Sequence, residues 1–263
     1  MKLLCPGILK ELFDITTTEN LLPQEEWDAS YGGYELFVAP ESDPIRIWIN
    51  RHVSDQKRGS CLELGCFPGR FLAVFGEQGF ELNGIDLTPR VERELPEWLR
   101  QRGFNVGQIL RADLFEHKWS RTFDVVCSFG LIEHFLNWQE LLRQHARLVA
   151  PGGLLLVSTP NFRGGLQGWI HRHFDSVNLE KHHLPAMDPP EWSRIASEEG
   201  LIDVENGGLG RFEFWIGGQT RSAPAKVFLK VLSRLQPFLR QVLPANDLRF
   251  APYYGLAARR PVI

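Results

Sequence analysis

The residues best placed to do chemistry are two acids that end apolar runs beside a glycine turn. Glu63 ends the first run, the turn Gly65–Gly69 follows, and a helix is expected from Arg70. Asp86 ends the next apolar run, about 20 residues past the turn. Glycines let a backbone bend sharply or approach a ligand closely, and an acid at this distance binds ribose hydroxyls in nucleotide-binding α/β units. The spacing therefore predicts a site for a ligand that carries a ribose.

The segment Glu63-Leu64-Gly65-Cys66-Phe67-Pro68-Gly69 resembles the first motif of class I methyltransferases, acid-x-Gly-x-Gly-x-Gly. These enzymes use S-adenosylmethionine (SAM). The segment departs from the motif at one place, because Phe67 occupies the middle glycine position. Phe67 could shape the SAM pocket, or it could displace the cofactor. The glycine spacing of Rossmann dehydrogenases, Gly-x-Gly-x-x-Gly, is absent from the turn, which disfavours an NAD-dependent dehydrogenase.

Three further segments resemble the same family in order and spacing. Asp86 and Leu87 are placed for the ribose, and Asp113 with Leu114 is similar to the segment beside adenine, although Asp113 could also belong to a surface turn. Residues 123–135 look like the fourth strand and its end, which faces the methionine part of SAM and the acceptor. The resemblance implies SAM as cofactor, bound by Glu63, Gly65, Cys66, Phe67, Gly69, Asp86, Leu87, Asp113, Leu114, Phe129 and Gly130.

Histidines are the candidates for a catalytic base. Methyl transfer to a hydroxyl benefits from a base with a pKa near the working pH, which histidine offers. His134 lies just past the fourth strand, where it could be the base or could pack on the following helix, and His182 with His183 is the second candidate. His171 and His173 together with His182 and His183 could instead suggest a metal site. No cysteine ligands lie nearby and no His-Glu-x-x-His pattern occurs, so no metal is expected.

Apolar runs that alternate with helical segments predict an α/β fold with a parallel sheet covered on both faces. With the resemblance, this becomes a Rossmann-like class I methyltransferase fold: a mostly parallel seven-stranded sheet with an N-terminal cap and lid insertions. Strands are expected at residues 60–64, up to 86, 106–110, 123–128, 154–158, 201–205 and 249–258. Helices are expected at residues 43–53, 70–78, 90–102, 138–148 and 191–199.

The chain divides into a lead-in and one large domain. Residues 1–55 are interpreted as an N-terminal cap whose aromatic residues, such as Trp27 and Tyr31, could cover a ligand. Residues 56–263 form the SAM-binding domain, and residues 160–189 within it read as a long acceptor loop. The basic residues of this loop could form a rim for an anionic acceptor, or could simply be solvated; they are Arg163, Arg172 and Lys181.

Residues 220–246 read as an amphipathic insertion. The stretch from Phe214 to Asn246 contains no acidic residue, and apolar residues recur at helical spacing. Pro237 is expected to kink or divide the helix. A basic amphipathic helix over residues 224–243 could make peripheral contact with the inner face of a membrane, or could pack on the core or the lid.

Composition limits the classes of partner. The chain of 263 residues is 43% hydrophobic and 23% charged, which is ordinary for a soluble protein, and its net charge of −3 gives no reason to expect nucleic-acid binding. The Asn/Asp-Pro-Pro-aromatic motif of base methyltransferases is absent after the fourth strand, so no nucleic-acid partner is expected. No apolar stretch approaches the roughly 20 residues that span a bilayer, and the four cysteines form no disulfide framework. These features favour a cytoplasmic protein.

The resemblance implies a SAM-dependent methyltransferase that acts on a small molecule, and hydroxyl oxygen is the favoured methyl acceptor. Sugars, quinones and lipid-linked precursors are the acceptor classes that fit the general pattern. Two alternatives stay open at this point. One is a SAM-binding protein that has lost catalysis, which Phe67 suggests, and the other is an NAD-dependent dehydrogenase.

Overall fold

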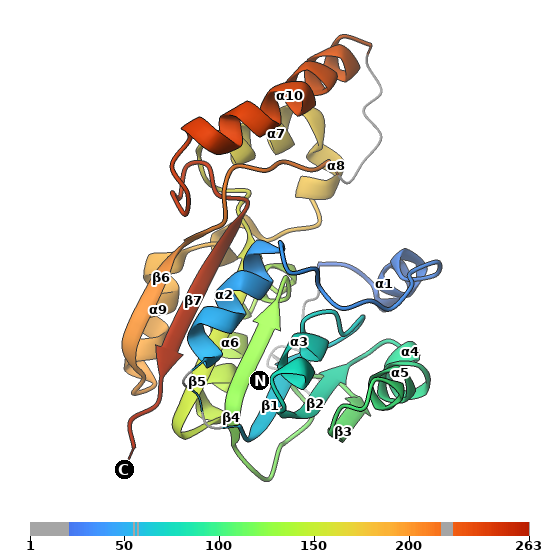
Figure 1. The fold of residues 1–263 in the computed structure, drawn as a ribbon, viewed down its shortest axis with the longest axis vertical. Coiled ribbons are helices and arrows are strands. Elements are labelled where there is room, and N and C mark those ends of the chain that lie inside the picture. The colour runs from blue at the N-terminus through green and yellow to red at the C-terminus, as the bar shows by residue number, and fades with distance from the viewer. Residues whose placement is uncertain (1–20, 55, 57, 217–222, 263) are drawn as a thin grey trace, which may run out of the picture.

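The computed structural model describes residues 21–54, 56, 58–216 and 223–262 (Figure 1). One sheet of seven strands runs through them in the order β3-β2-β1-β4-β5-β7-β6. Strands β1 to β5 pair in parallel, and β7 is antiparallel to both β5 and β6. This confirms the predicted mostly parallel seven-stranded sheet. The strands are β1 (Ser60–Leu64), β2 (Glu81–Asp86), β3 (Val106–Arg111), β4 (Phe123–Phe129), β5 (Val149–Pro160), β6 (Ile202–Leu209) and β7 (Tyr253–Arg259).

Helices cover both faces of the sheet and build the layer beyond its carboxyl edge (Figure 1). They are α1 (Gln24–Ser30), α2 (Pro44–Val53), α3 (Leu72–Glu77), α4 (Arg90–Arg93), α5 (Leu95–Gln101), α6 (Trp138–Arg147), α7 (Gly165–Phe174), α8 (Ser176–Leu179), α9 (Pro189–Glu198) and α10 (Ala223–Val242), with short 3-10 turns at Ile132–His134 and Leu184–Ala186. Asp43 begins α2 as predicted, because its carboxylate accepts the free N–H groups of Ile45 and Arg46.

Two apolar clusters fix the sheet between its helices. On one face, α2, α3 and α5 bury residues such as Ile49, Phe75 and Leu99. On the other face, α6 and α9 bury residues such as Leu141 and Trp192. The indole N–H of Trp192 donates to the carbonyl of Ala186 at 2.6 Å, so its one polar group is satisfied inside the core.

The site is positioned by the point where the strand order reverses. The chain runs outward from β1 to β2 and β3, and then returns to place β4 on the other side of β1. Ligands of open α/β sheets bind beyond the carboxyl ends of the strands at such a point. The turn that leaves β1 depends on Gly65, which has a φ of +68° and whose missing Cβ leaves room for Leu131.

Two expectations about the elements were wrong, and a third is narrowed. Residues 160–189 are not a loop, because they form α7, α8 and a 3-10 turn, and α7 packs with α10 around Ile170 and Leu232. Of the two outcomes expected for Pro237, division of the helix is excluded, because α10 runs unbroken from Ala223 to Val242. The charged helix expected over 90–102 is two helices, and the break falls where Pro96 can occupy the first turn of the second helix.

Candidate active site

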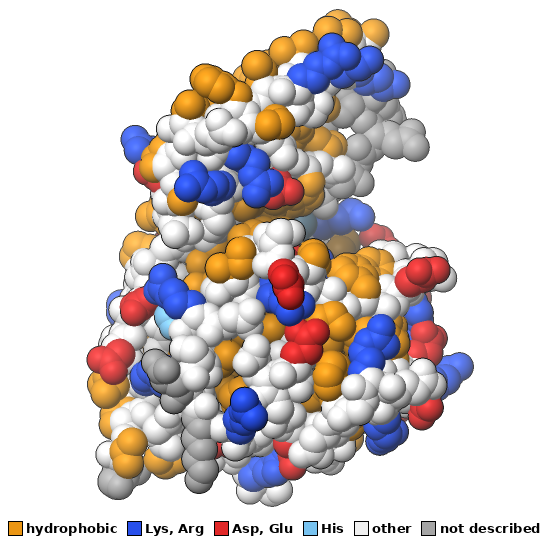
Figure 2. Space-filling view, in the orientation of Figure 1, with side chains coloured by type: hydrophobic (Ala, Val, Ile, Leu, Met, Phe, Trp, Pro, Cys, Tyr) orange, Lys and Arg blue, Asp and Glu red, His pale blue; other side chains and the backbone are white. Residues whose placement is uncertain are grey.

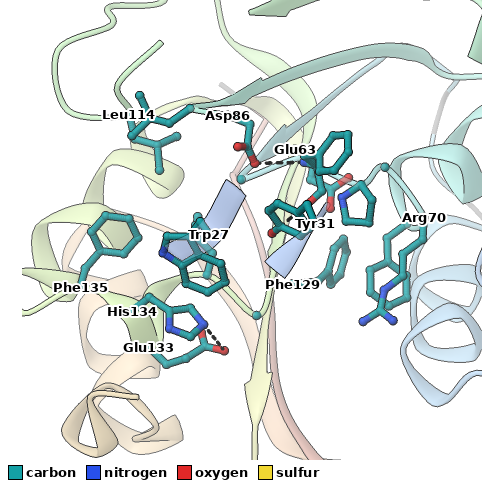
Figure 3. A pocket seen from close by; sticks show the side chains of 18 of the residues that line it. Trp27, Tyr31, Glu63, Arg70, Asp86, Leu114, Phe129, Glu133, His134 and Phe135 are labelled. Carbon is teal, nitrogen blue, oxygen red and sulfur yellow. Dashed lines mark hydrogen bonds and ion pairs between the residues drawn. The ribbon is translucent and has the colours of Figure 1, made fainter. Parts of the chain in front are cut away.

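A cavity of about 340 Å³ opens at the carboxyl ends of β1, β2 and β4 (Figure 3). All but one of the predicted cofactor-binding residues line it: Glu63, Gly65, Phe67, Gly69, Asp86, Leu87, Asp113, Leu114, Phe129 and Gly130. Cys66 does not, because its side chain is 1% exposed and packs against Gly84 of β2. The residues of the sequence motif therefore line a cavity, except that the side chain of Cys66 points into the core.

Asp86 stands at the end of β2, at one end of this cavity. One carboxylate oxygen accepts the backbone N–H of Phe67 at 3.1 Å, and the other accepts the backbone N–H of Thr88 at 3.0 Å. Burial raises the pKa of Asp86 to about 6, and the backbone N–H groups oppose that rise. The carboxylate is thus held between the glycine turn and the following loop, where it could accept ribose hydroxyls.

Glu63 lies beside Asp86 and is 4% exposed. The backbone N–H of Leu72, at the start of α3, bonds to the Glu63 carboxylate, while the second carboxyl oxygen has no partner among the described residues. Burial raises the pKa of Glu63 well above its usual range, and Arg70 opposes this. A buried acceptor without a partner beside a cavity could receive a donor from the ligand.

Residues 24–34, here called the N-terminal strap, cross the cavity. Gln24, Trp27, Tyr31 and Tyr34 of the strap all line it. Figure 3 shows Trp27 and Tyr31 between the acidic end, with Asp86, and the opposite end, with His134. The expectation that strap aromatics could cover a ligand agrees with this placement.

His134 and His182 meet at the opposite end of the cavity, with their ring centroids 4.7 Å apart. Nδ1 of His134 lies 2.9 Å from the carbonyl oxygen of Lys181, and Nδ1 of His182 lies 2.8 Å from that of Asn178. Because a carbonyl oxygen only accepts, each Nδ1 carries the proton and each Nε2 keeps a free lone pair. Burial lowers the pKa of His134 to about 3 and that of His182 to about 4, so both rings are neutral.

Glu133 was missed by the sequence reasoning, although it stands directly before His134. Its side chain is fully buried, lines the cavity, and has no partner for either carboxyl oxygen among the described residues. One of these oxygens lies 4.0 Å from Nε2 of His134, and burial raises the pKa of Glu133 to about 8. An acid next to the candidate histidine was the signal that could have identified it.

Glu133, His134 and His182 could together hold a divalent cation. One ligand atom from each lies within 4.8 Å of the others. Two imidazoles and a carboxylate form a common protein ligand set, and in such sites the second ring nitrogen donates to a carbonyl, as it does here. Of the histidines that the sequence suggested for a metal site, only His182 belongs to this group.

The remaining histidines of residues 160–189 do not line the cavity. His171 is buried against Phe162 and pairs with Asp175 at 3.1 Å. Nδ1 of His173 bonds to the carbonyl of its own helix at Trp169. The backbone N–H of His183 donates to the carbonyl of Glu133, but its ring does not reach the cavity. Of the pair His182-His183, only the first is placed to act on a ligand.

The basic rim proposed for these residues is not assembled at the cavity. Arg163 pairs with Asp188 at 2.6 Å, and Arg172 donates to the carbonyl of Gly168. Neither they nor Lys181 line the cavity wall. An anionic acceptor would therefore find no cation among these three.

Residues 43–206 match a family model described as a methyltransferase domain, which covers well over half of the chain. The chain belongs to this methyltransferase family. Membership of this family makes the protein a SAM-dependent methyltransferase rather than an NAD-dependent dehydrogenase.

Two curated relatives share the same name. The methyltransferase is 28% identical over 177 residues to the ubiquinone biosynthesis O-methyltransferase of Azoarcus sp. (strain BH72), a match that spans 64% of this chain and 75% of that protein. It is 26% identical over 124 residues to the protein of the same name from Rickettsia canadensis (strain McKiel), which covers 45% of this chain and 52% of the relative. The match thus spans about half the length of the Rickettsia relative.

Solved structures share the fold of the methyltransferase. A SAM-dependent methyltransferase from Archaeoglobus fulgidus aligns with a TM-score of 0.55 at 20% identity and covers 90% of this chain and 99% of that one. The phosphoethanolamine N-methyltransferase 2 of Haemonchus contortus, solved with SAM, aligns with a TM-score of 0.54 at 19% identity over 90% of this chain and 56% of that one. At these identities the likeness is one of fold.

Proposed function

We propose that this methyltransferase transfers a methyl group from SAM to a hydroxyl oxygen of a small, flat acceptor of the kind found in quinone precursors. The observation that carries the proposal is the two-ended cavity, with Asp86 at one end and the free Nε2 atoms of His134 and His182 at the other. The names of the relatives support oxygen as the acceptor atom. Sugars are the alternative class, and the aromatic cavity walls favour a flat ring.

When bound, SAM supplies the methyl group as a sulfonium, and its transfer is an in-line displacement. The protein holds the ribose end at Asp86 and presents Nε2 of His134 or His182 to the acceptor hydroxyl. Because pKa values of about 3 and 4 make these rings weak bases, they take the proton only as the new C–O bond forms and the hydroxyl becomes strongly acidic. Trp27, Phe129 and Phe135 line the path between these groups and limit access by water. Alignment and proton removal are thus the contributions of this chain.

Phe67 does not support the alternative of a SAM-binding protein without activity. The cavity stays open beside it, and its backbone N–H is used to hold Asp86. Its ring makes contacts with the N-terminal strap and with Arg90. The departure from the glycine motif therefore leaves the space that a cofactor needs.

The acceptor is further proposed to be lipid-linked and to be met at a membrane surface. Val227, Val231, Leu235, Phe238 and Val242 form one stripe along α10, and each is 48% to 63% exposed. Lys226, Lys230 and Arg234 recur at the same helical spacing beside the stripe. Figure 2 shows hydrophobic side chains along the outer edge of this helix with basic ones next to them. Among the described residues, no helix is long and apolar enough to span a bilayer.

The test is a methyl-transfer assay with small phenols and catechols, read by mass spectrometry of the product. The expected result is a methyl ether, with activity falling about 10²- to 10⁴-fold in His134→Gln or His182→Gln while SAM affinity changes little. His183→Gln is the matched control. Binding of SAM without turnover on any hydroxyl acceptor, including those of a cell extract, would contradict the proposal.

Addition of EDTA to the same assay shows whether the histidine end of the cavity acts without a metal or binds a divalent cation. Activity that survives EDTA assigns the imidazoles as bases. Activity that is lost, and restored by a divalent cation, assigns Glu133, His134 and His182 as its ligands.

A further inference from the structure

The ring of Phe67, a residue that lines the cavity, is also enclosed by contacts with other residues. Tyr31 of the N-terminal strap meets it edge to face, with centroids 4.9 Å apart and an interplanar angle of 75°. On the same ring, the guanidinium carbon of Arg90 lies 5.0 Å from the centroid. Phe67 is 4% exposed as a result. A glycine at this position would offer neither residue a surface to pack on.

Arg90 ties the same part of the strap by hydrogen bonds. One guanidinium nitrogen donates to the carbonyl of Tyr31, and the other terminal nitrogen donates to the carbonyl of Tyr34 at 3.0 Å. Glu94, one helical turn further on, accepts from Nε of Arg90 at 2.8 Å and orients the guanidinium plane. A planar group with several fixed donors can bridge two carbonyls in a way that an ammonium group cannot.

The other end of the strap is joined to the acceptor end of the cavity. The Trp27 ring packs edge-on against the His134 ring at 4.6 Å, and just before the strap the backbone N–H of Leu21 donates to the carbonyl of His134 at 3.1 Å. The strap therefore spans the cavity from Phe67 to His134, with four of its side chains in the wall. A ligand that fills the cavity lies beneath it.

We propose that Phe67 and Arg90 are positioning residues that fasten the N-terminal strap over bound SAM. Phe67 occupies the middle glycine position of the motif because its ring anchors Tyr31 and supports Arg90, which in turn holds two strap carbonyls. Exchange of SAM for S-adenosylhomocysteine then requires release of these contacts. The inference deepens the proposed function, since it rests on the cavity being the SAM site, but it does not depend on the acceptor or on the catalytic base.

The experiment measures the dissociation rate of S-adenosylhomocysteine by stopped-flow displacement with excess SAM, using the full chain. Phe67→Ala and Arg90→Met are each expected to accelerate dissociation about tenfold, because the first removes the ring that packs on Tyr31 and the second removes the hydrogen bonds to the carbonyls of Tyr31 and Tyr34. The double variant should be little faster than either single one, since both residues act on the same segment. Phe67→Tyr, which keeps the ring, should restore the slow rate.

Arg102→Met is the matched control. Arg102 also stacks over an aromatic ring, that of Trp98 at 4.2 Å, but neither residue lines the cavity. Its dissociation rate should equal that of the wild type. Thermal unfolding without ligand is recorded for every variant, and Phe67→Leu replaces Phe67→Ala if the latter does not fold.

Two outcomes would overturn the proposal in different ways. Dissociation rates of folded Phe67→Leu and Arg90→Met within twofold of the wild type would show that the strap is not fastened by these residues, and would leave the methyltransferase assignment intact. Failure of the wild type to bind S-adenosylhomocysteine would instead remove the cofactor site, and with it both the strap proposal and the proposed function.

Discussion

At the scale of single residues, Asp86 shows how the fold orients a strand-end acid towards a cavity. Its two oxygens are held by the N–H groups of Phe67 and Thr88, so its orientation is set before any ligand arrives. Burial raises its pKa to about 6 from an ordinary value of 3.8. The folded protein therefore binds the proton more tightly than the unfolded chain does, and the carboxylate form is complete only above about pH 7.

SAM affinity should follow the ionisation of Asp86. We expect it to weaken as the pH falls through about 6, because a protonated carboxyl is a poorer acceptor for ribose hydroxyls. Asp86→Asn should bind SAM about 10- to 100-fold more weakly at pH 8 and should lose this pH dependence. Calorimetric titration at several pH values measures both effects, with Glu97→Gln on the surface of α5 as control. An unchanged pH dependence in Asp86→Asn would assign it to another group.

His145 is a second residue whose ionisation is coupled to folding. Its Nδ1–H donates to the carbonyl of Leu141 at 2.7 Å, so its Nε2 accepts from the hydroxyl of Ser128 at 2.9 Å. Burial lowers its pKa to about 4. The neutral ring therefore belongs to the folded state, and stability is lost as the pH falls from the unfolded value of 6.5 towards 4.

The loss attributable to His145 should be about 2 kcal/mol between pH 7 and pH 5, since each unit of pKa difference corresponds to about 1.4 kcal/mol. Urea unfolding of the wild type and of His145→Gln at both pH values isolates it. The variant is expected to be less stable at pH 7, and to lose less on acidification. Parallel losses in the two proteins would show that His145 is not the group that titrates.

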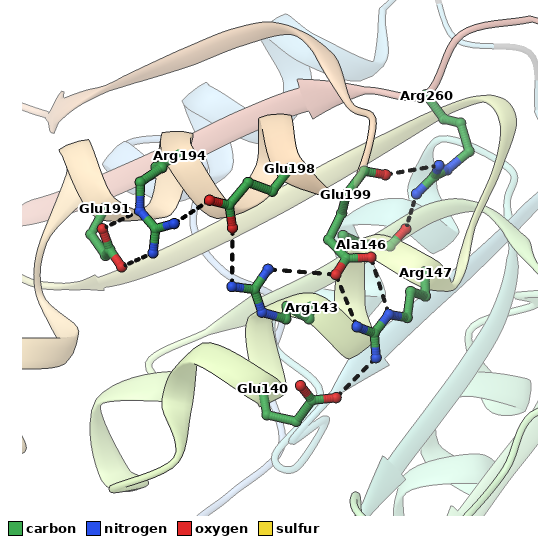
Figure 4. A network of polar contacts seen from close by, with 9 residues as sticks. All are labelled: Glu140, Arg143, Ala146, Arg147, Glu191, Arg194, Glu198, Glu199 and Arg260. Carbon is green, nitrogen blue, oxygen red and sulfur yellow. Dashed lines mark hydrogen bonds and ion pairs between the residues drawn. The ribbon is translucent and has the colours of Figure 1, made fainter.

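At the scale of elements, α6 and α9 are joined both by core packing and by a surface network of ions (Figure 4). Arg147 donates to Glu199 at 2.9 Å and to Glu140 at 2.9 Å, and Arg143 reaches Glu198 at 3.1 Å. Exposed ion pairs contribute little, because water screens the charges and long side chains lose entropy. The buried Trp192 should therefore hold these helices far more strongly than the network does.

The comparison of Trp192→Ala with Glu199→Gln tests this ranking. Trp192→Ala should lower the free energy of unfolding by about 3–5 kcal/mol through the cavity it leaves. Glu199→Gln should lower it by less than about 1 kcal/mol, and less still at high salt. Chemical denaturation at two salt concentrations gives both values. A loss for Glu199→Gln that rivals the tryptophan would mean that the network acts as a unit.

The helix α10 has two apolar faces, of which one is packed against α7 and the other is exposed. Leu232 and its neighbours pack against α7, whereas Val231, Leu235 and Phe238 face outward. We expect the methyltransferase to float with anionic vesicles at low salt and to be released by salt, because basic side chains flank the outward stripe. Leu235→Ser with Phe238→Ser should abolish flotation, and Ile47→Ser, which removes an exposed apolar residue on α2, is the matched control. Equal flotation of all three proteins would contradict the membrane proposal.

At the scale of the whole molecule, the structure is a sheet with a cavity at the carboxyl ends of its strands, and two further parts of the chain lie at that edge. The N-terminal strap lies across the cavity, and α7, α8 and α10 form a layer beyond the strand ends (Figure 1). His182 comes from this layer, whereas His134 and Glu133 follow β4. The acceptor end of the cavity is therefore assembled from distant parts of the chain, and the cofactor end from local turns.

The sequence by itself determined the sheet and its order along the chain, and it predicted residues that line the cavity at the ends of β1 and β2. Those features depend on local patterns, namely apolar runs of strand length, an acid near the end of each of the first two strands and a glycine turn between these strands. Only the tertiary structure brought His182 to His134, buried Glu133 beside them and turned Cys66 and His183 away. The packing of α7 against α10 is likewise a long-range contact. The physical reason is that burial and long-range contact set the orientation and the pKa of these side chains, and neither is encoded in the spacing of neighbouring residues.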